Sequence, residues 1–132
     1  MHNRTVAIPI IRFTREFTAS SSTPVKVDYE PLEPISFQHI PKAWALQVTG
    51  YDAAGAVVAS SAWDVLLVGS LDDAAFNETS KILENVSGTQ QNGDVVFSGA
   101  SSFPTNYAAV ICKTLTLGMT CTRIVVSVLG VF

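Results

Sequence analysis

The feature that most constrains this chain is a central stretch in which period-two alternation is punctuated by tight-turn residues. Between residues 44 and 49, large apolar side chains alternate with small or polar ones, the pattern of a strand with one buried face. Asp52 can hydrogen-bond to the backbone that follows it and Gly55 can adopt positive φ, so a hairpin loop is expected there, with residues 56–59 returning. Residues 62–69 are almost all apolar, as in a strand covered on both faces. Three short strands in one stretch predict a β-sandwich.

The rest of the chain repeats this pattern of short apolar runs and turn residues. Pro31, Pro34 and Pro41 exclude a helix from their segment. Roughly eight to ten strands result, at a spacing of roughly 8–12 residues that is typical of sandwiches and jelly rolls. The candidate strands are residues 5–13, 25–29, 35–37, 44–49, 56–59, 62–69, 81–86, 95–97, 107–117 and 122–131. We therefore predict one all-β domain over residues 1–132, a jelly-roll-like β-sandwich with at most one short helix.

Turn chemistry predicts how neighbouring strands are joined. Residues 14–23 end in a run of Ala, Ser and Thr and are expected to be a loop or flexible arm. Asn92-Gly93 is a hairpin signal, and Gly118 marks the turn of a hairpin that joins residues 107–117 to residues 122–131.

Two further local predictions concern the cysteines and Asp72. In the hairpin inferred around Gly118, Cys112 and Cys121 do not lie opposite each other, so buried free thiols are expected rather than a disulfide. Asp72 suits the N-cap of a short helix over residues 73–79, with a polar loop as the alternative.

Charged residues are scarce in this chain. They make up 14% of the sequence, whereas soluble domains average about 25%. Net and mixed charge ordinarily keep a small free domain soluble, so a surface of Ser, Thr, Ala and Gln suits a subunit of an assembly. The alternative is that the Ser and Thr hydroxyls provide the solvation.

The charge is also unevenly placed. Residues 1–26 hold four basic residues and one acidic residue, a net charge of +3, whereas residues 27–132 hold four basic and ten acidic residues, a net charge of −6. So few cations are a weak signal for nucleic acid, and no nucleic-acid partner is expected. The basic segment fits an N-terminal arm over residues 1–24 that docks on an acidic protein surface. Solvated strand edges explain the same charges equally well.

The C-terminal run, residues 124–132, is apolar on both strand faces up to the last residue. Chain ends ordinarily tolerate polar residues, so this run must be buried in the domain or against a neighbouring chain. Arginine and aromatic side chains dominate interface hot spots. We therefore predict partner contacts at both chain ends, and expect a chain without residues 1–18 to stay folded but no longer to associate. The predicted contact residues are Arg4, Ile8, Arg12, Phe13, Arg15, Phe17, Val131 and Phe132.

No catalytic, cofactor or metal signature is visible in the sequence. His2 and His39 belong to no nucleophile motif, and there is no G-x-S-x-G, P-loop or H-E-x-x-H. The pair Asp72-Asp73 would need several more oxygen ligands to hold calcium, so a cap is preferred. We predict no enzymatic activity, no cofactor and no metal. No run approaches the roughly 20 apolar residues of a membrane span, and no membrane partner is expected.

The second half of the chain resembles small virion proteins of tailed phages. W-D-V-L-L-V-G-S-L-D at residues 63–72 resembles their W-x-V-x-L-x-G-S-x-D strand and turn. F-P-T-N-Y-A-A-V at residues 103–110 resembles their P-x-x-Y strand, L-T-L-G at residues 115–118 resembles their S-L-x-G turn, and I-V-V-S-V-L-G at residues 124–130 resembles their terminal strand. The same layout is similar to discoidin-like carbohydrate-binding sandwiches, in which S-x-D-G precedes an aromatic residue; here Asp73 replaces the glycine.

The resemblance to phage proteins implies a capsid cement, or decoration, protein, or a related head or tail component. The cement protein is the one we predict. Such a protein would be made in the host cytoplasm and lie on the capsid surface of the virion, as a dimer or trimer that clamps neighbouring major capsid subunits. The alternative resemblance implies a carbohydrate-binding module, which needs accessible aromatic rings. Because Trp44 and Trp63 lie in strand patterns and are expected in the core, only Tyr51, Phe76 and Tyr107 could supply such rings.

Overall fold

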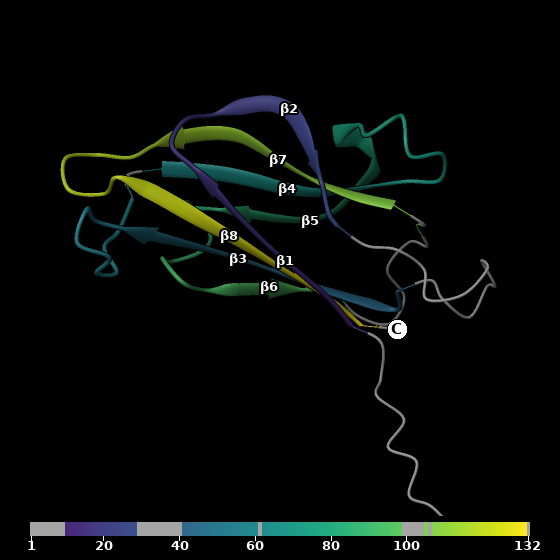
Figure 1. Cartoon of the computed structure of the whole chain (residues 1–132), viewed down its shortest axis with the longest axis horizontal. Coiled ribbons are helices and arrows are strands. Elements are labelled where there is room, and N and C mark those ends of the chain that lie inside the picture. The colour runs from purple at the N-terminus through teal and green to yellow at the C-terminus, as the bar shows by residue number, and fades with distance from the viewer. Residues whose placement is uncertain (1–9, 29–40, 61, 99–104, 106, 132) are drawn as a thin grey trace, which may run out of the picture.

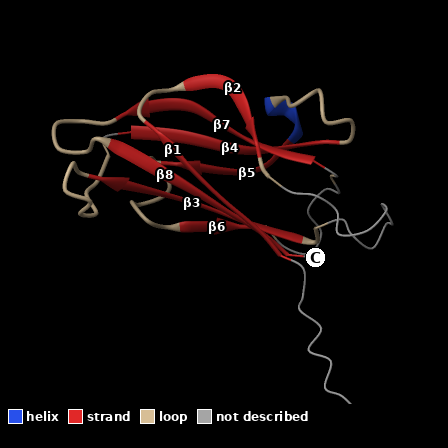
Figure 2. Cartoon of the chain, viewed as in Figure 1, coloured by secondary structure: helices blue, strands red, loops and turns tan. Residues whose placement is uncertain are grey.

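The protein is a sandwich of two antiparallel β-sheets, as Figure 1 shows. The computed structural model describes residues 10–28, 41–60, 62–98, 105 and 107–131. Sheet A has the strand order β1-β8-β3-β6, and sheet B has the order β2-β7-β4-β5. The strands are β1 (Ile10–Phe17), β2 (Ser21–Lys26), β3 (Ala43–Tyr51), β4 (Ala62–Ser70), β5 (Lys81–Val86), β6 (Val95–Phe97), β7 (Tyr107–Thr116) and β8 (Arg123–Val131). Within the described residues the helical content is one 3₁₀ turn, η2 (Glu78–Ser80), drawn blue in Figure 2.

The strand order is that of a jelly roll. Among the strands that the structure describes, six of the seven connections between consecutive strands pass from one sheet to the other, and β4 to β5 alone stays within a sheet. Eight strands wound in this way over two antiparallel sheets define the jelly roll. The predicted all-β, jelly-roll-like sandwich is therefore confirmed.

The core lies between the two sheets and follows the period of the strands. Buried residues alternate with half-buried ones along the whole of β3 and β8, because successive side chains of a strand point to opposite faces. Trp44 and Leu46 of β3 face inward, as does Trp63 of β4, and all three are at most 3% exposed. The prediction that both tryptophans are core residues is confirmed. Each fully buried side chain of this kind stabilises the fold by about 1.5–3 kcal/mol.

A buried asparagine links the two sheets near β5 and β6. Asn85 of β5 is fully buried, and its Oδ1 accepts a hydrogen bond from Nε1 of Trp63 at 2.8 Å. Its Nδ2 lies 3.2 Å from the carbonyl oxygens of Leu46 in sheet A and of Asp94, and donates to both. A buried amide is tolerated there because its donors and its acceptor are all paired.

β4 is covered on both faces, as predicted from its apolar run. On the outer face of sheet B, Leu66 and Val68 form a second buried cluster together with residues of β7, and Phe76 from the β4–β5 connection packs against it. Ion pairs tie that connection to its neighbours: Lys26 lies 3.1 Å from Asp73, and Lys113 lies 3.4 Å from Glu78.

The predicted hairpins have different outcomes. The loop after β3 forms as predicted: Oδ1 of Asp52 accepts hydrogen bonds from the N–H groups of Ala54 and Ala56 at 2.9 and 2.8 Å, and Gly55 has a φ of 87°. The chain returns from this loop as an isolated bridge from Val57 to Tyr51, and residues 56–59 form no strand. The hairpins predicted at Gly93 and Gly118 are wrong, although both glycines adopt positive φ, 86° and 82°. Their turns nevertheless carry the chain from sheet B to sheet A, from β5 to β6 and from β7 to β8. Turn residues shape a local reversal, but they do not determine which sheet the next strand joins.

The interpretation of residues 14–23 as a loop or arm is also wrong. β1 continues to Phe17, and β2 begins at Ser21 after a short connection. Ile11 and Phe17 belong to the core cluster. β2 accommodates Pro24 through a register shift between Ser21 and Val25, at the edge of sheet B where proline is tolerated. The part of the proposed N-terminal arm that the structure describes thus supplies a strand to each sheet.

Asp72 caps a turn and not the helix predicted over residues 73–79. Its Oδ1 accepts hydrogen bonds from the backbone N–H groups of Ala74 and Ala75, each at 3.0 Å, and from the Ser70 hydroxyl at 2.7 Å. These bonds lower the pKa of Asp72 to about 2, with the Ala75 N–H contributing most. The 3₁₀ turn begins only after Asn77, so the polar-loop alternative holds for the residues before it.

Three further predictions have different outcomes. Cys112 and Cys121 are buried free thiols, as predicted, and burial raises the pKa of Cys112 to about 11. The predicted strand at residues 35–37 lies outside the described residues. In the part of the chain that the structure describes, no helix has the length and apolarity to cross a membrane.

Candidate functional site on the outer face of sheet A

The outer face of sheet A presents two rows of side chains that cross all four strands. The residues in these rows alternate with core residues, so their side chains point away from the second sheet. The register places each member directly opposite its neighbours on the adjacent strands. We call these residues the A face. They are Arg12, Leu129, Ala45 and Phe97 in the first row, and Thr14, Ser127, Gln47 and Val95 in the second.

The β6 end of the A face is its most exposed apolar part. Phe97 is 76% exposed and Val95 is 48% exposed. β6 is a three-residue edge strand, and β3 is its strand partner within the described residues. A large exposed aromatic side chain beside further apolar residues is the composition found at the centres of protein interfaces.

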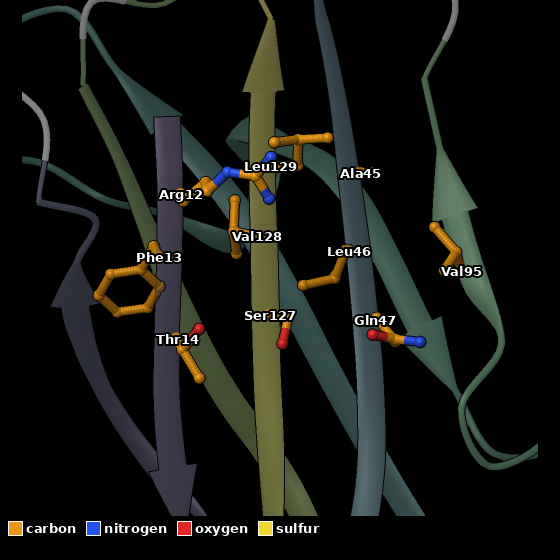
Figure 3. Close-up of a pocket in the computed structure, with 10 residues that line it drawn as sticks. All are labelled: Arg12, Phe13, Thr14, Ala45, Leu46, Gln47, Val95, Ser127, Val128 and Leu129. Atoms are coloured by element: carbon orange, nitrogen blue, oxygen red, sulfur yellow. The ribbon is translucent and has the colours of Figure 1, made fainter. Parts of the chain in front are cut away.

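An open hollow of about 340 Å³ crosses the A face from β1 to β6, and Figure 3 shows its lining. Every A-face residue except Phe97 contributes to it, together with Phe13, Leu46 and Val128. Leu46 and Val128 are core residues, so the strands that carry them form the floor of the hollow. The curvature suits a partner with a protruding side chain or loop.

Arg12 supplies the charge on the A face. Its side chain is exposed, lies over β8 beside Leu129 in Figure 3, and makes no ion pair with any residue in the described ranges. At the other side, Nε2 of Gln47 donates a hydrogen bond to the carbonyl oxygen of Gly93 at 2.8 Å, which fixes this side chain. The A face therefore has an apolar end on β6 and a positive end on β1.

Arg123, just beyond the A face, holds three strands together. Its Nε lies 3.3 Å from a carboxylate oxygen of Glu16 on β1, and its Nη1 donates to the carbonyl oxygen of Asp52 at 2.9 Å. Its guanidinium carbon lies 5.3 Å from the centroid of the Tyr51 ring on β3, within cation–π range. These contacts link β1, β3 and β8 at the border of the A face.

The chemistry of the A face suits association. Its ionisable group is the guanidinium of Arg12, which stays protonated in proteins and cannot act as a base. Across the residues that the structure describes, no three metal-ligating side chains come together. Apolar groups, hydroxyls, an amide and a cation remain, and these are the groups with which proteins contact other proteins or polar ligands.

The outer face of sheet B differs, because the chain covers it with the β4–β5 connection. It does carry an unusual carboxyl pair, Asp64 and Glu84. Oδ1 of Asp64 is buried without a hydrogen-bond partner. Burial raises the pKa of Asp64 to about 6, and the neighbouring carboxylate of Glu84 adds to the rise. The hydrogen bond from Asp64 lowers the pKa of Glu84, whose Oε1 also lies 3.0 Å from Nζ of Lys81.

The structure brings together only some of the predicted contact residues. Arg12 and Phe13 line the hollow, and Val131 lies two residues beyond Leu129 on the same face of β8. Arg15 is exposed on β1, but it alternates with Arg12 and points to the opposite face. Phe17 is 8% exposed and is part of the core, so it is unavailable to a partner. The remaining predicted residues lie outside the described ranges: Arg4, Ile8 and Phe132.

The three rings left for sugar stacking do not form a platform. Tyr51 ends β3 at the end of the sandwich where β4 begins, whereas Tyr107 pairs with Ser70 at the opposite end. Phe76 packs against the outer cluster of sheet B. An aromatic binding surface built from these residues, as the carbohydrate-binding alternative requires, is therefore not assembled.

Sequence reasoning identified Arg12 and missed the other residues of the A face: Phe97, Val95, Gln47, Leu129, Ala45, Thr14 and Ser127. In the short run Val95–Phe97 every side chain is apolar, so alternation could not show which side chains point outward. A partial signal was present in β3 and β8, where Gln47 and Ser127 interrupt apolar alternation at positions that prove to be opposite each other.

Comparisons with known proteins place the chain in no family. No protein-family model matches it, and the search of curated proteins finds no match. Among solved structures, the chain is similar to the SPBc2 prophage-derived protein YomS, with 10% sequence identity and a TM-score of 0.45 over 98% of this chain and 100% of that one.

Proposed function

We propose that this protein is a structural subunit of a phage particle, of the capsid cement type, which clamps neighbouring major capsid subunits. In this proposal it is not an enzyme, it self-associates as a dimer or trimer, and it lies on the capsid surface after synthesis in the host cytoplasm. Neither nucleic acid nor membrane is a partner.

The observation that carries the proposal is the A face. It is a broad surface across four strands, it exposes Phe97 and Val95, and the described part of the chain does not cover it. The outer face of sheet B differs in this respect, because Phe76 of the same chain packs over its apolar cluster. A surface of this kind fits a protein partner with a large contact area, which a clamp between subunits needs.

Composition and fold add support of a weaker kind. A chain with 14% charged residues suits permanent residence in an assembly. The jelly roll is shared by viral capsid domains and lectins, and this is an analogy at the level of the fold, which by itself determines no function. The discoidin-like alternative has less support, because its candidate rings lie at opposite ends of the sandwich.

Co-sedimentation with capsids tests the proposal. Purified protein is mixed with undecorated shells of the phage whose genome carries its coding sequence, and the bound fraction is measured against concentration. Saturable binding is expected, and Phe97→Ser should weaken it by about tenfold or more, since aromatic hot spots are typically worth at least about 2 kcal/mol.

The matched control is Leu71→Ser, because Leu71 is 69% exposed but lies in the β4–β5 connection and not on the A face. This variant should bind like the wild type. Absence of saturable binding, or an equal effect of both substitutions, would refute the proposal. A specific hit on a glycan array that Phe97→Ser removes would favour the carbohydrate-binding alternative instead.

A further inference from the structure

We propose that β1 is an edge at which two copies of this protein pair, so that their A sheets join into one continuous sheet. This inference rests on the self-association included in the proposed function and is independent of what the capsid contributes.

β1 is a long, regular strand with one free edge. All eight of its residues pair with β8 in unbroken register, and no second strand neighbours it within the described residues. β1 contains neither proline nor a bulge, two devices that block pairing at sheet edges. Its charged residues Arg12, Arg15 and Glu16 also block pairing, except with a strand that supplies complementary groups opposite them. The other edges differ: β6 has three residues, β5 has a register shift opposite Leu67 and Val68, and β2 has both a register shift and Pro24.

The geometry of a sheet restricts how β1 can pair with its copy. Directly opposite residues of antiparallel strands point to the same face. If the outer face of one A sheet is to continue into the outer face of the other, outward residues must face outward residues. The two-fold axis between the strands must then pass beside a residue, so that this residue lies opposite its own copy. An axis between two residues would place outward residues opposite inward ones.

An axis beside Thr14 makes every pair along β1 complementary. On the outer face, Arg12 of each copy lies opposite Glu16 of the other, which gives two symmetric ion pairs. On the inner face, the Arg15 guanidinium meets the ring of Phe13, a cation–π arrangement. Figure 3 shows that ring on the side of β1 away from β8.

Neighbouring registers lack this complementarity. An axis beside Phe13 places Arg12 opposite Thr14 and the apolar Ile11 opposite Arg15. An axis beside Arg15 places the two copies of Arg15 directly opposite each other, and like charges in that position are destabilising. The charge pattern of β1 therefore selects the axis beside Thr14.

The two charged groups are available for this contact. Arg12 is exposed and makes no ion pair within the described residues, so its flexible side chain can turn from β8 toward a neighbouring strand. The Glu16 side chain is 62% exposed, and its contact to Arg123 at 3.3 Å involves one carboxylate oxygen. The second oxygen can accept from Arg12 of the other copy, which places that carboxylate between two cations.

Disulfide trapping of Thr14→Cys tests the axis directly. Residues directly opposite across antiparallel strands have Cα atoms roughly 4.5–5.5 Å apart, within the range of a disulfide. The full-length variant should form a covalent dimer rapidly under mild oxidation, as seen by non-reducing electrophoresis. The native Cys112 and Cys121 are buried and do not compete.

Ser127→Cys is the matched control, because Ser127 lies beside Thr14 on the same face but on β8. Its two copies would be three strand spacings apart, roughly 14 Å, which is too far for a disulfide. Trapping of Thr14→Cys without trapping of Ser127→Cys supports the proposal. Failure of Thr14→Cys to cross-link, or equal cross-linking of both variants, overturns it whether or not the protein binds capsids.

A charge exchange provides a second, reversible test by sedimentation velocity. Arg12→Glu alone and Glu16→Arg alone each place like charges opposite each other at both symmetric sites. Each should raise the dimer dissociation constant by about tenfold or more. An equimolar mixture of the two variants restores opposite charges at both sites and should dimerise nearly as well as the wild type. A mixture that associates no better than either variant alone, or a monomeric wild type, overturns the proposal.

Discussion

At the scale of single residues, the Asp64–Glu84 pair makes the stability of the fold depend on pH. When both carboxyls are ionised, Oδ1 of Asp64 remains buried without a hydrogen-bond donor. When Asp64 is protonated, it can donate to Glu84, and the repulsion between the two groups disappears. The folded protein therefore holds a proton on this pair at a pH where an exposed aspartate has lost it.

The pH dependence has a definite direction. Because the folded-state pKa of Asp64 is about 6, above its ordinary value of 3.8, its protonated form stabilises the fold. That contribution is complete below about pH 4 and is lost as the pH rises through about 6. Asp64→Asn should remove this loss, so its melting temperature should rise relative to the wild type between pH 5 and pH 7.5. Asp28→Asn, a change at an exposed site, is the control. Parallel profiles for the wild type and Asp64→Asn would contradict the assignment.

Asn85 shows how one buried polar residue can link two sheets. Its replacement by alanine leaves Nε1 of Trp63 and the carbonyl oxygen of Leu46 without their partner, and it opens a cavity. We expect Asn85→Ala to lower the free energy of unfolding by about 2–4 kcal/mol in urea denaturation. Asn77→Ala should change it by less than about 0.5 kcal/mol, because the Asn77 side chain makes no capping hydrogen bond. Similar values for the two variants would show that Asn85 plays no linking role.

At the scale of elements, Gly50 sets how closely the β3–β4 connection approaches β3. A Cβ at this position would lie 2.5 Å from the carbonyl oxygen of Val58 and 3.0 Å from Sγ of Cys121. The backbone of Val58 cannot withdraw easily, because its N–H donates to the carbonyl oxygen of Gly50 at 3.0 Å. The glycine is therefore a packing requirement, and not a turn requirement.

Gly50→Ala should lower the free energy of unfolding by about 1–3 kcal/mol through overpacking. Gly88→Ala is the matched control, because open space surrounds that position and its φ is not positive. Gly88→Ala should change the free energy of unfolding by no more than about 1 kcal/mol. A small increase is consistent with this, because alanine reduces the conformational entropy of the unfolded chain. Chemical denaturation of both variants decides the matter, and equal stability of Gly50→Ala and the wild type would contradict the close approach.

Local sequence predicted the strands of this fold better than their pairing. Lys81–Val86 and Val95–Phe97 were predicted with the bounds that the structure has, because turn residues flank each of them. The turns at Gly93 and Gly118 were also expected. Which sheet the strand after each turn joins was not predicted. In a jelly roll that choice depends on burial across the whole sandwich, and no local pattern carries it.

The same limit explains what was missed at β1 and at the A face. Ile11, Phe13 and Phe17 face inward, and Arg15 interrupts their apolar alternation because it also faces inward, at the edge of the sheet. The sequence pattern therefore predicts that the strand ends at residue 13, whereas β1 continues to Phe17. Ala45 lies between Phe97 and Leu129 on the A face, because β3 pairs with β6 on one side and with β8 on the other, and these strands are distant in sequence. Arg12 and Phe13 were predicted as contact residues from their type and from their place in the basic N-terminal segment, and both line the hollow.

At the scale of the whole molecule, the described part of the N-terminal segment belongs to the sandwich and not to a detachable arm. β1 contributes Ile11 and Phe17 to the core and is one of the two strands that flank β8 in sheet A. Burial of two such side chains stabilises the fold by about 3–6 kcal/mol. A domain has a total stability of only about 5–15 kcal/mol. Loss of β1 would also leave the apolar strand β8 as a new sheet edge.

Deletion of residues 1–18 should therefore abolish cooperative folding, contrary to the expectation from sequence alone. The truncated chain should be insoluble or lack a thermal transition in circular dichroism, because β8 loses a neighbour along its whole length. Phe17→Ala in the full chain separates packing from strand loss and should lower the free energy of unfolding by about 3–5 kcal/mol. Arg15→Ala, on the same strand but exposed, should leave it within about 0.5 kcal/mol of the wild type. A truncated chain that is soluble and unfolds cooperatively would show instead that seven strands suffice, and that β1 serves association rather than the fold.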